Sequence, residues 1–147
     1  RSTTRDHTLR PMLLGILTLG IVGAGTELLL LGHFEEPWQW VPLVVLAGSL
    51  VTVLLTAVRR SRGTLLTMRG VMGVSVLSGA LGVWRHFRGN VEFELEMYPS
   101  ISGLELFEKA VTGATPALSP GTMILLGLLG LAFTYGHPAL GGSDKPK

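Results

Sequence analysis

The chain has 147 residues, of which 47% are apolar and 15% charged, and its mean hydropathy is +0.47. A soluble domain carries roughly 25% charged residues, so this composition excludes an ordinary water-exposed globule and indicates a membrane protein. The 20 glycines agree, because glycine is more frequent in transmembrane helices than in soluble ones. The sequence has no cysteine, which excludes disulfide frameworks, thiolate metal sites and cysteine nucleophiles.

Four apolar stretches are long enough to cross a bilayer, which takes about 20 helical residues. They cover residues 11–31, 41–58, 65–84 and 115–135. In the last of them, Ser119 and Pro120 have the pattern of an N-cap followed by a proline at the first helical position. The sequence therefore predicts one all-α membrane domain with four transmembrane helices, the last of which starts late in its stretch.

The charges are divided unequally between the two sides of these spans. The side with both termini carries nine basic and two acidic residues, whereas the other side carries three basic and seven acidic residues. By the positive-inside rule, both termini are predicted to lie in the cytoplasm. The nine basic residues are Arg1, Arg5, Arg10, Arg59, Arg60, Arg62, Arg69, Lys145 and Lys147.

The largest piece outside the predicted spans is residues 85–114, on the periplasmic side. Residues 91–97 alternate between apolar residues and glutamates, which predicts a β-strand with one apolar face. The apolar positions are Val91, Phe93, Leu95 and Met97. Ser102 and Glu105 have capping-box spacing ahead of a predicted short helix over Gly103–Thr112. We expect this strand and helix to be ordered against the membrane or a neighbouring subunit.

Small residues indicate where membrane helices approach one another. They concentrate in 11–31 and in 65–84, where Ser75 and Gly79 have small-xxx-small spacing, while 41–58 is mostly bulky. The first and third stretches are therefore predicted to form the close pair. The second stretch is predicted to face lipid or a partner.

Eight of the ten aromatic residues lie on the predicted periplasmic side. One interpretation is an interfacial belt of the kind that anchors membrane helices, and the other is a contact surface for a partner. The candidate partner-contact residues are Trp38, Trp40, Trp84, Phe93, Leu95, Tyr98 and Phe107.

Two polar residues inside the predicted spans are further candidates, Glu27 and Arg69. An ionisable residue at membrane depth is a functional hypothesis because a charge in lipid is costly. Three interpretations of Glu27 stay open: a structural link to a hydroxyl group, to Arg85 or to His86; proton or ion coupling; and a contact with another subunit. His33 and His86 lie on the same side, but no ligand spacing joins them, so no metal site is predicted.

The sequence contains no catalytic constellation, phosphate-binding loop or dinucleotide fingerprint. The chain is therefore predicted not to be an enzyme and to bind no cofactor by itself, which leaves open contacts with lipid or with the pigment of a neighbouring subunit. The basic turn over residues 59–62 is explained by anionic lipid headgroups, so no nucleic acid is expected as a partner.

Several segments in the C-terminal half resemble small bacterial inner-membrane proteins. They are RGNVEFE at 88–94, TGATPAL at 112–118, Pro120-Gly121, GLLG at 127–130 and His137-Pro138. The resemblance carries no catalytic residues. It implies recruitment as an accessory subunit of a photosynthetic reaction-centre or light-harvesting assembly.

Two functions are carried forward. The leading hypothesis is a non-catalytic accessory subunit that contacts the bilayer and larger membrane-protein subunits. The alternative is a small ion- or proton-coupled transporter that acts through Glu27.

Overall fold

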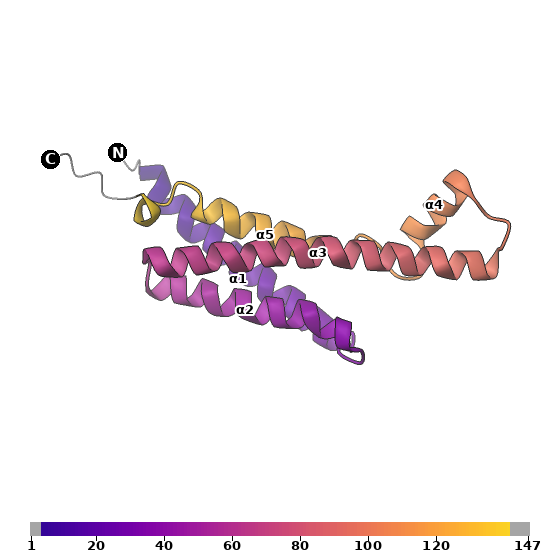
Figure 1. Cartoon of the computed structure of the whole chain (residues 1–147). Helices are drawn as coiled ribbons and strands as arrows, with labels where there is room; N and C mark the ends of the chain where they lie inside the picture. Colours follow the sequence, from indigo (N-terminus) through magenta and orange to yellow (C-terminus); the bar gives the residue numbers. More distant parts are fainter. Residues whose placement is uncertain (1–3, 142–147) are drawn as a thin grey trace.

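The computed structural model describes residues 4–141, and all regular structure in that range is helical (Figure 1). The elements are α1 (Thr4–Leu30), η1 (Pro37–Gln39), α2 (Trp40–Val58), α3 (Arg62–Met97), α4 (Gly103–Thr112), α5 (Gly121–Thr134) and η2 (Pro138–Leu140). Some of the charged residues used to predict the orientation lie outside the described part of the chain: Arg1, Asp144, Lys145 and Lys147, together with the side chains of Arg5 and Asp6.

Three of these helices are long and apolar enough to cross a bilayer, over Leu9–Leu30, Pro37–Val58 and Arg62–Met97. Their outward side chains include exposed leucines such as Leu19 and Leu77, which suits contact with lipid tails. The first three predicted spans are thus confirmed as long apolar helices, and their length and hydropathy are those of membrane-embedded segments.

The fourth predicted span is only partly helical. Helix α5 has 14 residues and rises about 21 Å, whereas the hydrocarbon core is about 30 Å thick. Residues 113–120, which precede α5, contain no regular helix. Pro116 and Pro120 explain this break, because proline has no N–H to donate and disfavours a helical conformation in the residue before it. The late start of this helix was predicted correctly, although Pro120 itself is the N-cap.

The strand predicted over residues 91–97 is wrong, because α3 continues as one helix to Met97. Glutamate, leucine and methionine are good helix formers, and Arg88 and Glu92 form an i,i+4 ion pair with an N–O distance of 2.9 Å. A single strand would also have no neighbour to pair with. On the helix, the alternating apolar residues point to both sides instead of sharing one face.

The short helix predicted over Gly103–Thr112 is confirmed as α4. The predicted capping box is not formed, since Ser102 makes no side-chain cap hydrogen bond. The turn into α4 instead depends on Gly103, whose φ of +60° lies in a region that side chains other than glycine rarely adopt.

Helix α3 is the central element of the bundle. It packs mainly against α5 and α2, and α1 packs against α2 and α5 rather than against α3. The predicted close pair of the first and third helices is therefore wrong. Helix α2 is not merely a lipid-facing helix either, because it buries Leu46, Ser49 and Val53. The core cluster includes Leu17, Ile21, Leu65, Met68, Met72 and Phe133.

Small residues explain why α3 and α5 are the close pair. A Cβ added at Gly79 would lie 2.8 Å from the backbone nitrogen of Ile124, and one at Gly127 would lie 2.6 Å from the backbone oxygen of Met72. Ser75 Oγ donates to the Met123 carbonyl oxygen at 2.9 Å within the same contact. Ser75 and Gly79, predicted to face the first helix, therefore face α5.

Two arginines bind the C-terminal end of α5. Arg69 Nε donates to Thr134 Oγ1 at 3.1 Å, and Arg10 Nη1 donates to the Phe133 carbonyl oxygen at 2.7 Å. Guanidinium groups suit this position because the last carbonyls of a helix lack intrahelical donors and carry partial negative charge. This end of the bundle, which also holds the basic turn at residues 59–62, is called the basic end below. Figure 1 shows the described ends of α1 and α5 together there.

Candidate functional site

Helix α3 projects well beyond the rest of the bundle at the end opposite the basic end (Figure 1). Its last 13 residues, 85–97, extend about 20 Å past Trp84. Residues 98–114 then turn back, with α4 against α3. We call residues 85–114 the arm.

Asn90 fastens the arm together. Its side chain is buried, and Nδ2 donates to the carbonyl oxygens of Ala110 at 2.8 Å and Thr115 at 2.6 Å. Its Oδ1 accepts a hydrogen bond from the Thr115 backbone N–H at 3.3 Å. Gly113 permits this close approach, since a Cβ there would lie 2.8 Å from Asn90 Cγ. One side chain of α3 therefore holds the end of α4 and the start of the following segment.

His86 supports the same irregular segment one turn earlier. Its Nδ1 lies 3.1 Å from the carbonyl oxygen of Pro116. A carbonyl can only accept, so the hydrogen bond requires the proton on Nδ1. Backbone groups outside regular structure need partners other than a helix or a sheet, and side chains can supply them. His86 and Asn90 provide that support for residues 115 and 116.

Further contacts hold α4 and the preceding turn against α3. The rings of Phe87 and Phe107 lie 5.9 Å apart between centroids, and Lys109 Nζ lies 4.0 Å from the centre of the Tyr98 ring. Lys109 also forms an ion pair with Glu94 at 3.9 Å. The arm is thus a folded helical hairpin, helical where a strand was predicted.

All seven candidate partner-contact residues are exposed. They do not form one patch. Trp38 lies under the guanidinium of Arg85, with 4.9 Å between Cζ and the ring centre, and Trp40 contacts Phe34. Phe93, Leu95 and Tyr98 lie on the part of the arm beyond Asn90, whereas Trp84 and Phe107 line a groove nearer the bundle.

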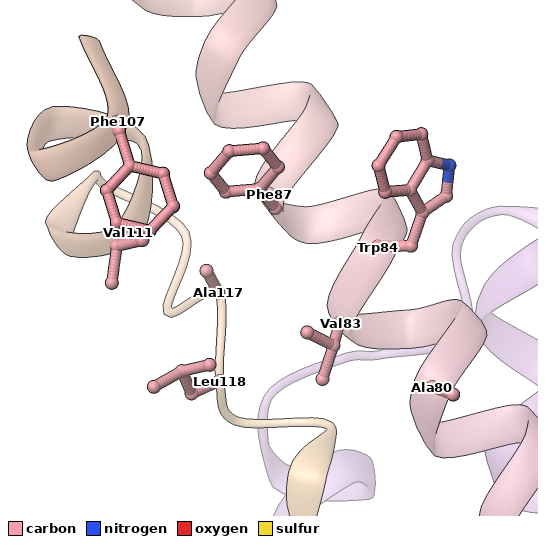
Figure 2. Close-up of a pocket in the computed structure, with 8 residues that line it drawn as sticks. All are labelled: Ala80, Val83, Trp84, Phe87, Phe107, Val111, Ala117 and Leu118. Carbon is pink, nitrogen blue, oxygen red and sulfur yellow. The ribbon is translucent and has the colours of Figure 1, made fainter. Parts of the chain in front are cut away.

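This groove lies where α3, α4 and the segment before α5 meet, and we call it the boundary groove (Figure 2). It is open on one side and has a volume of about 330 Å³. Its lining residues are Ala80, Val83, Trp84, Phe87, Phe107, Val111, Ala117 and Leu118. Six of these were not predicted as site residues. Each is an ordinary apolar residue in the sequence, and only the fold brings the three segments together.

Glu27 lies in the last turn of α1, and its side chain faces outward. Among the described residues its carboxylate has no hydrogen-bond or ion-pair partner. The proposed link to Arg85 or His86 is not formed, because Arg85 contacts Trp38 and His86 contacts Pro116. Arg69, the other intramembrane candidate, donates hydrogen bonds to the hydroxyl and carbonyl oxygens of Thr134 at the end of α5.

Of the two outer histidines, His33 has a lowered pKa. Burial lowers the pKa of His33, and the neighbouring His86 lowers it further. Within residues 4–141, no group of three or more potential ligands could hold a metal ion. At the basic end, burial and then Arg10 and Arg60 lower the pKa of His137, whose Nδ1 accepts a hydrogen bond from the Ala139 N–H.

Comparison of the chain with known protein families, with curated proteins and with solved structures finds no match in any of the three.

Proposed function

We propose that this chain is a non-catalytic accessory subunit of a larger membrane complex and that the outer arm is its docking element. The observation that carries the proposal is a set of large apolar side chains on the arm that are exposed beyond the reach of lipid. They are Phe93, Leu95, Met97, Tyr98 and Leu104.

Distance along α3 separates these residues from the bilayer. Tryptophan is enriched at the membrane–water interface, so Trp84 marks the level at which α3 leaves it. Phe93 lies nine residues further along the helix, about 13.5 Å beyond Trp84. At that height a lipid tail cannot cover it, and burying such a side chain is worth roughly 1.5–3 kcal/mol. Burial of Phe93 therefore requires the surface of another protein.

The charges of the arm indicate what that partner presents. The arm carries five glutamates against Arg85, Arg88 and Lys109. Arg88 pairs with Glu92 and Lys109 with Glu94, which leaves the carboxylates of Glu96, Glu105 and Glu108 exposed among apolar side chains without an ion-pair partner in residues 4–141. A complementary partner has an apolar patch with a basic rim.

The test replaces Phe93 with glutamate. Because Phe93 is half exposed and lies about 13.5 Å beyond Trp84, we expect thermal stability of the isolated protein to be unchanged while co-purification with larger subunits falls at least tenfold. Tyr135→Glu provides the matched control, since Tyr135 is an exposed aromatic residue at the basic end. Equal recovery of partners with both variants would contradict docking through the arm.

The proposal includes an orientation in a bacterial inner membrane with both termini in the cytoplasm and the arm in the periplasm. The arginines at residues 10, 59, 60, 62 and 69 support it, because all are at the basic end. A reporter fused after Lys147 is expected to be cytoplasmic, and one inserted near Ser100 periplasmic. Both reporters in one compartment would rule out this topology.

Among membrane complexes, the sequence resemblance favours a photosynthetic reaction-centre or light-harvesting assembly as the partner. The arm would then lie against the periplasmic face of a larger subunit. Co-purification of pigment-binding subunits with the unmodified chain, and their loss with Phe93→Glu, would support this choice.

A further inference from the structure

We propose that the boundary groove binds one acyl chain of a phospholipid from the leaflet on the arm side. This inference is independent of the docking proposal, because the groove lies nearer the bundle than Phe93 and the other exposed apolar residues on which docking depends. Lipid can reach it, whereas lipid cannot reach Phe93.

The lining of the groove fits a hydrocarbon chain. Its eight lining residues are all apolar or aromatic, and its volume falls within the roughly 300–1,000 Å³ of typical small-ligand sites. Figure 2 shows Phe107, Val111 and Leu118 on one side and the α3 residues Val83, Trp84 and Phe87 on the other. Such a surface offers no hydrogen-bond partner from its side chains except the indole N–H of Trp84.

The depth of the groove identifies lipid as the occupant. Its lower end is at Ala80, four residues and about 6 Å below Trp84, within the apolar part of α3. Leu77 and Leu81, next to Ala80 on the same helix, are exposed lipid-facing residues. The groove is therefore continuous with the bilayer-facing surface of the bundle, and its upper end reaches the pair of rings formed by Phe87 and Phe107.

Charge at the upper end matches a phospholipid headgroup. Arg88 follows Trp84 by about one helical turn and is exposed, with Glu92 as its ion-pair partner, whereas Arg85 stacks over Trp38. A phosphate at this level would compete with Glu92 for the Arg88 guanidinium while its acyl chain runs toward Ala80. Arginine suits phosphate because its guanidinium fork donates paired hydrogen bonds.

The experiment measures lipid retained by the full chain. Protein reconstituted in vesicles of phosphatidylglycerol and phosphatidylcholine is re-extracted in detergent, washed and analysed by native mass spectrometry. We expect one retained phospholipid on the unmodified chain and on Leu77→Phe, and at least tenfold less on Ala80→Phe. Ala80 is exposed and lines the groove, so phenylalanine fills it without displacing a packed side chain.

A second measurement locates the retained lipid. In the variant Trp38→Phe, Trp40→Phe, the remaining tryptophan is Trp84 in the groove. Brominated acyl chains retained after washing are expected to quench its fluorescence, and Ala80→Phe is expected to abolish the quenching. Two results would overturn the proposal: no lipid retained by the unmodified chain, or equal retention by Ala80→Phe. Release of protein partners by Ala80→Phe without lipid loss would assign the groove to a partner instead.

Discussion

Replacing Gly127 with alanine is expected to destabilise the bundle by about 1–3 kcal/mol, the usual range for inserting atoms into a packed interior. The added Cβ would lie 2.6 Å from the Met72 carbonyl oxygen and 3.0 Å from the Val76 backbone nitrogen. Both are backbone atoms of a helix and cannot rotate away, so α5 must move off α3. Alanine gains up to about 1 kcal/mol in helix propensity over glycine, which offsets only part of this cost.

Gly73→Ala is the matched control for this prediction. Gly73 lies on α3 close to Met72 in sequence, but a Cβ there meets no atom within 4 Å. We expect Gly73→Ala to leave stability unchanged or to raise it slightly. Thermal unfolding in detergent micelles measures both variants, and a loss of similar size at the two positions would show that α3 and α5 do not pack through Gly127.

Gly127 and Gly73 illustrate which features of the packing the sequence could reveal and which it could not. The small residues of both helices were visible, but helix pairing depends on which faces the connecting segments bring together. Residues 113–120 place α5 along α3, and α1 then lies against α2 and α5. The length and hydropathy of a helix are local properties, whereas its neighbour is set by the whole chain.

The wrong strand at residues 91–97 has a different cause. Seven alternating residues match a strand period, but the same glutamate, leucine and methionine residues also favour a helix. A helix with this pattern has apolar side chains on both sides. In the arm, Val91 is half buried on one side of α3, and Phe93, on the other side, is exposed.

The candidate site was predicted in part for a similar reason. Exposed aromatic residues near the predicted interface could be recognised from their position in the chain. The boundary groove could not, because it needs Ala117 and Leu118 beside Phe87, 30 residues earlier in the sequence. Asn90 produces this juxtaposition, and an asparagine in an apparently exposed segment gives no signal that it is buried.

Replacing Asn90 with leucine is therefore expected to have a large effect that is confined to the arm. It removes three hydrogen bonds and leaves the carbonyls of Ala110 and Thr115 without their donor. Lost hydrogen bonds and unsatisfied buried groups of this kind cost roughly 2–4 kcal/mol together. Since about 1.4 kcal/mol corresponds to a factor of ten, amide hydrogen exchange in α4 should accelerate about 30- to 1,000-fold.

The helices of the bundle should keep their exchange rates in Asn90→Leu, because Asn90 lies beyond Trp84 and its side-chain hydrogen bonds are to the arm and the segment that follows it. Gly89→Ala is the control, since a Cβ at this exposed neighbour meets nothing within 4 Å.

Asn90→Asp separates the two roles of the amide. The carboxylate keeps the acceptor for the Thr115 N–H but faces two carbonyl oxygens without a donor, so α4 should open as readily as in Asn90→Leu. Slow exchange in α4 of Asn90→Asp would show that the donated hydrogen bonds do not hold the arm, and that the ring pair of Phe87 and Phe107 is sufficient.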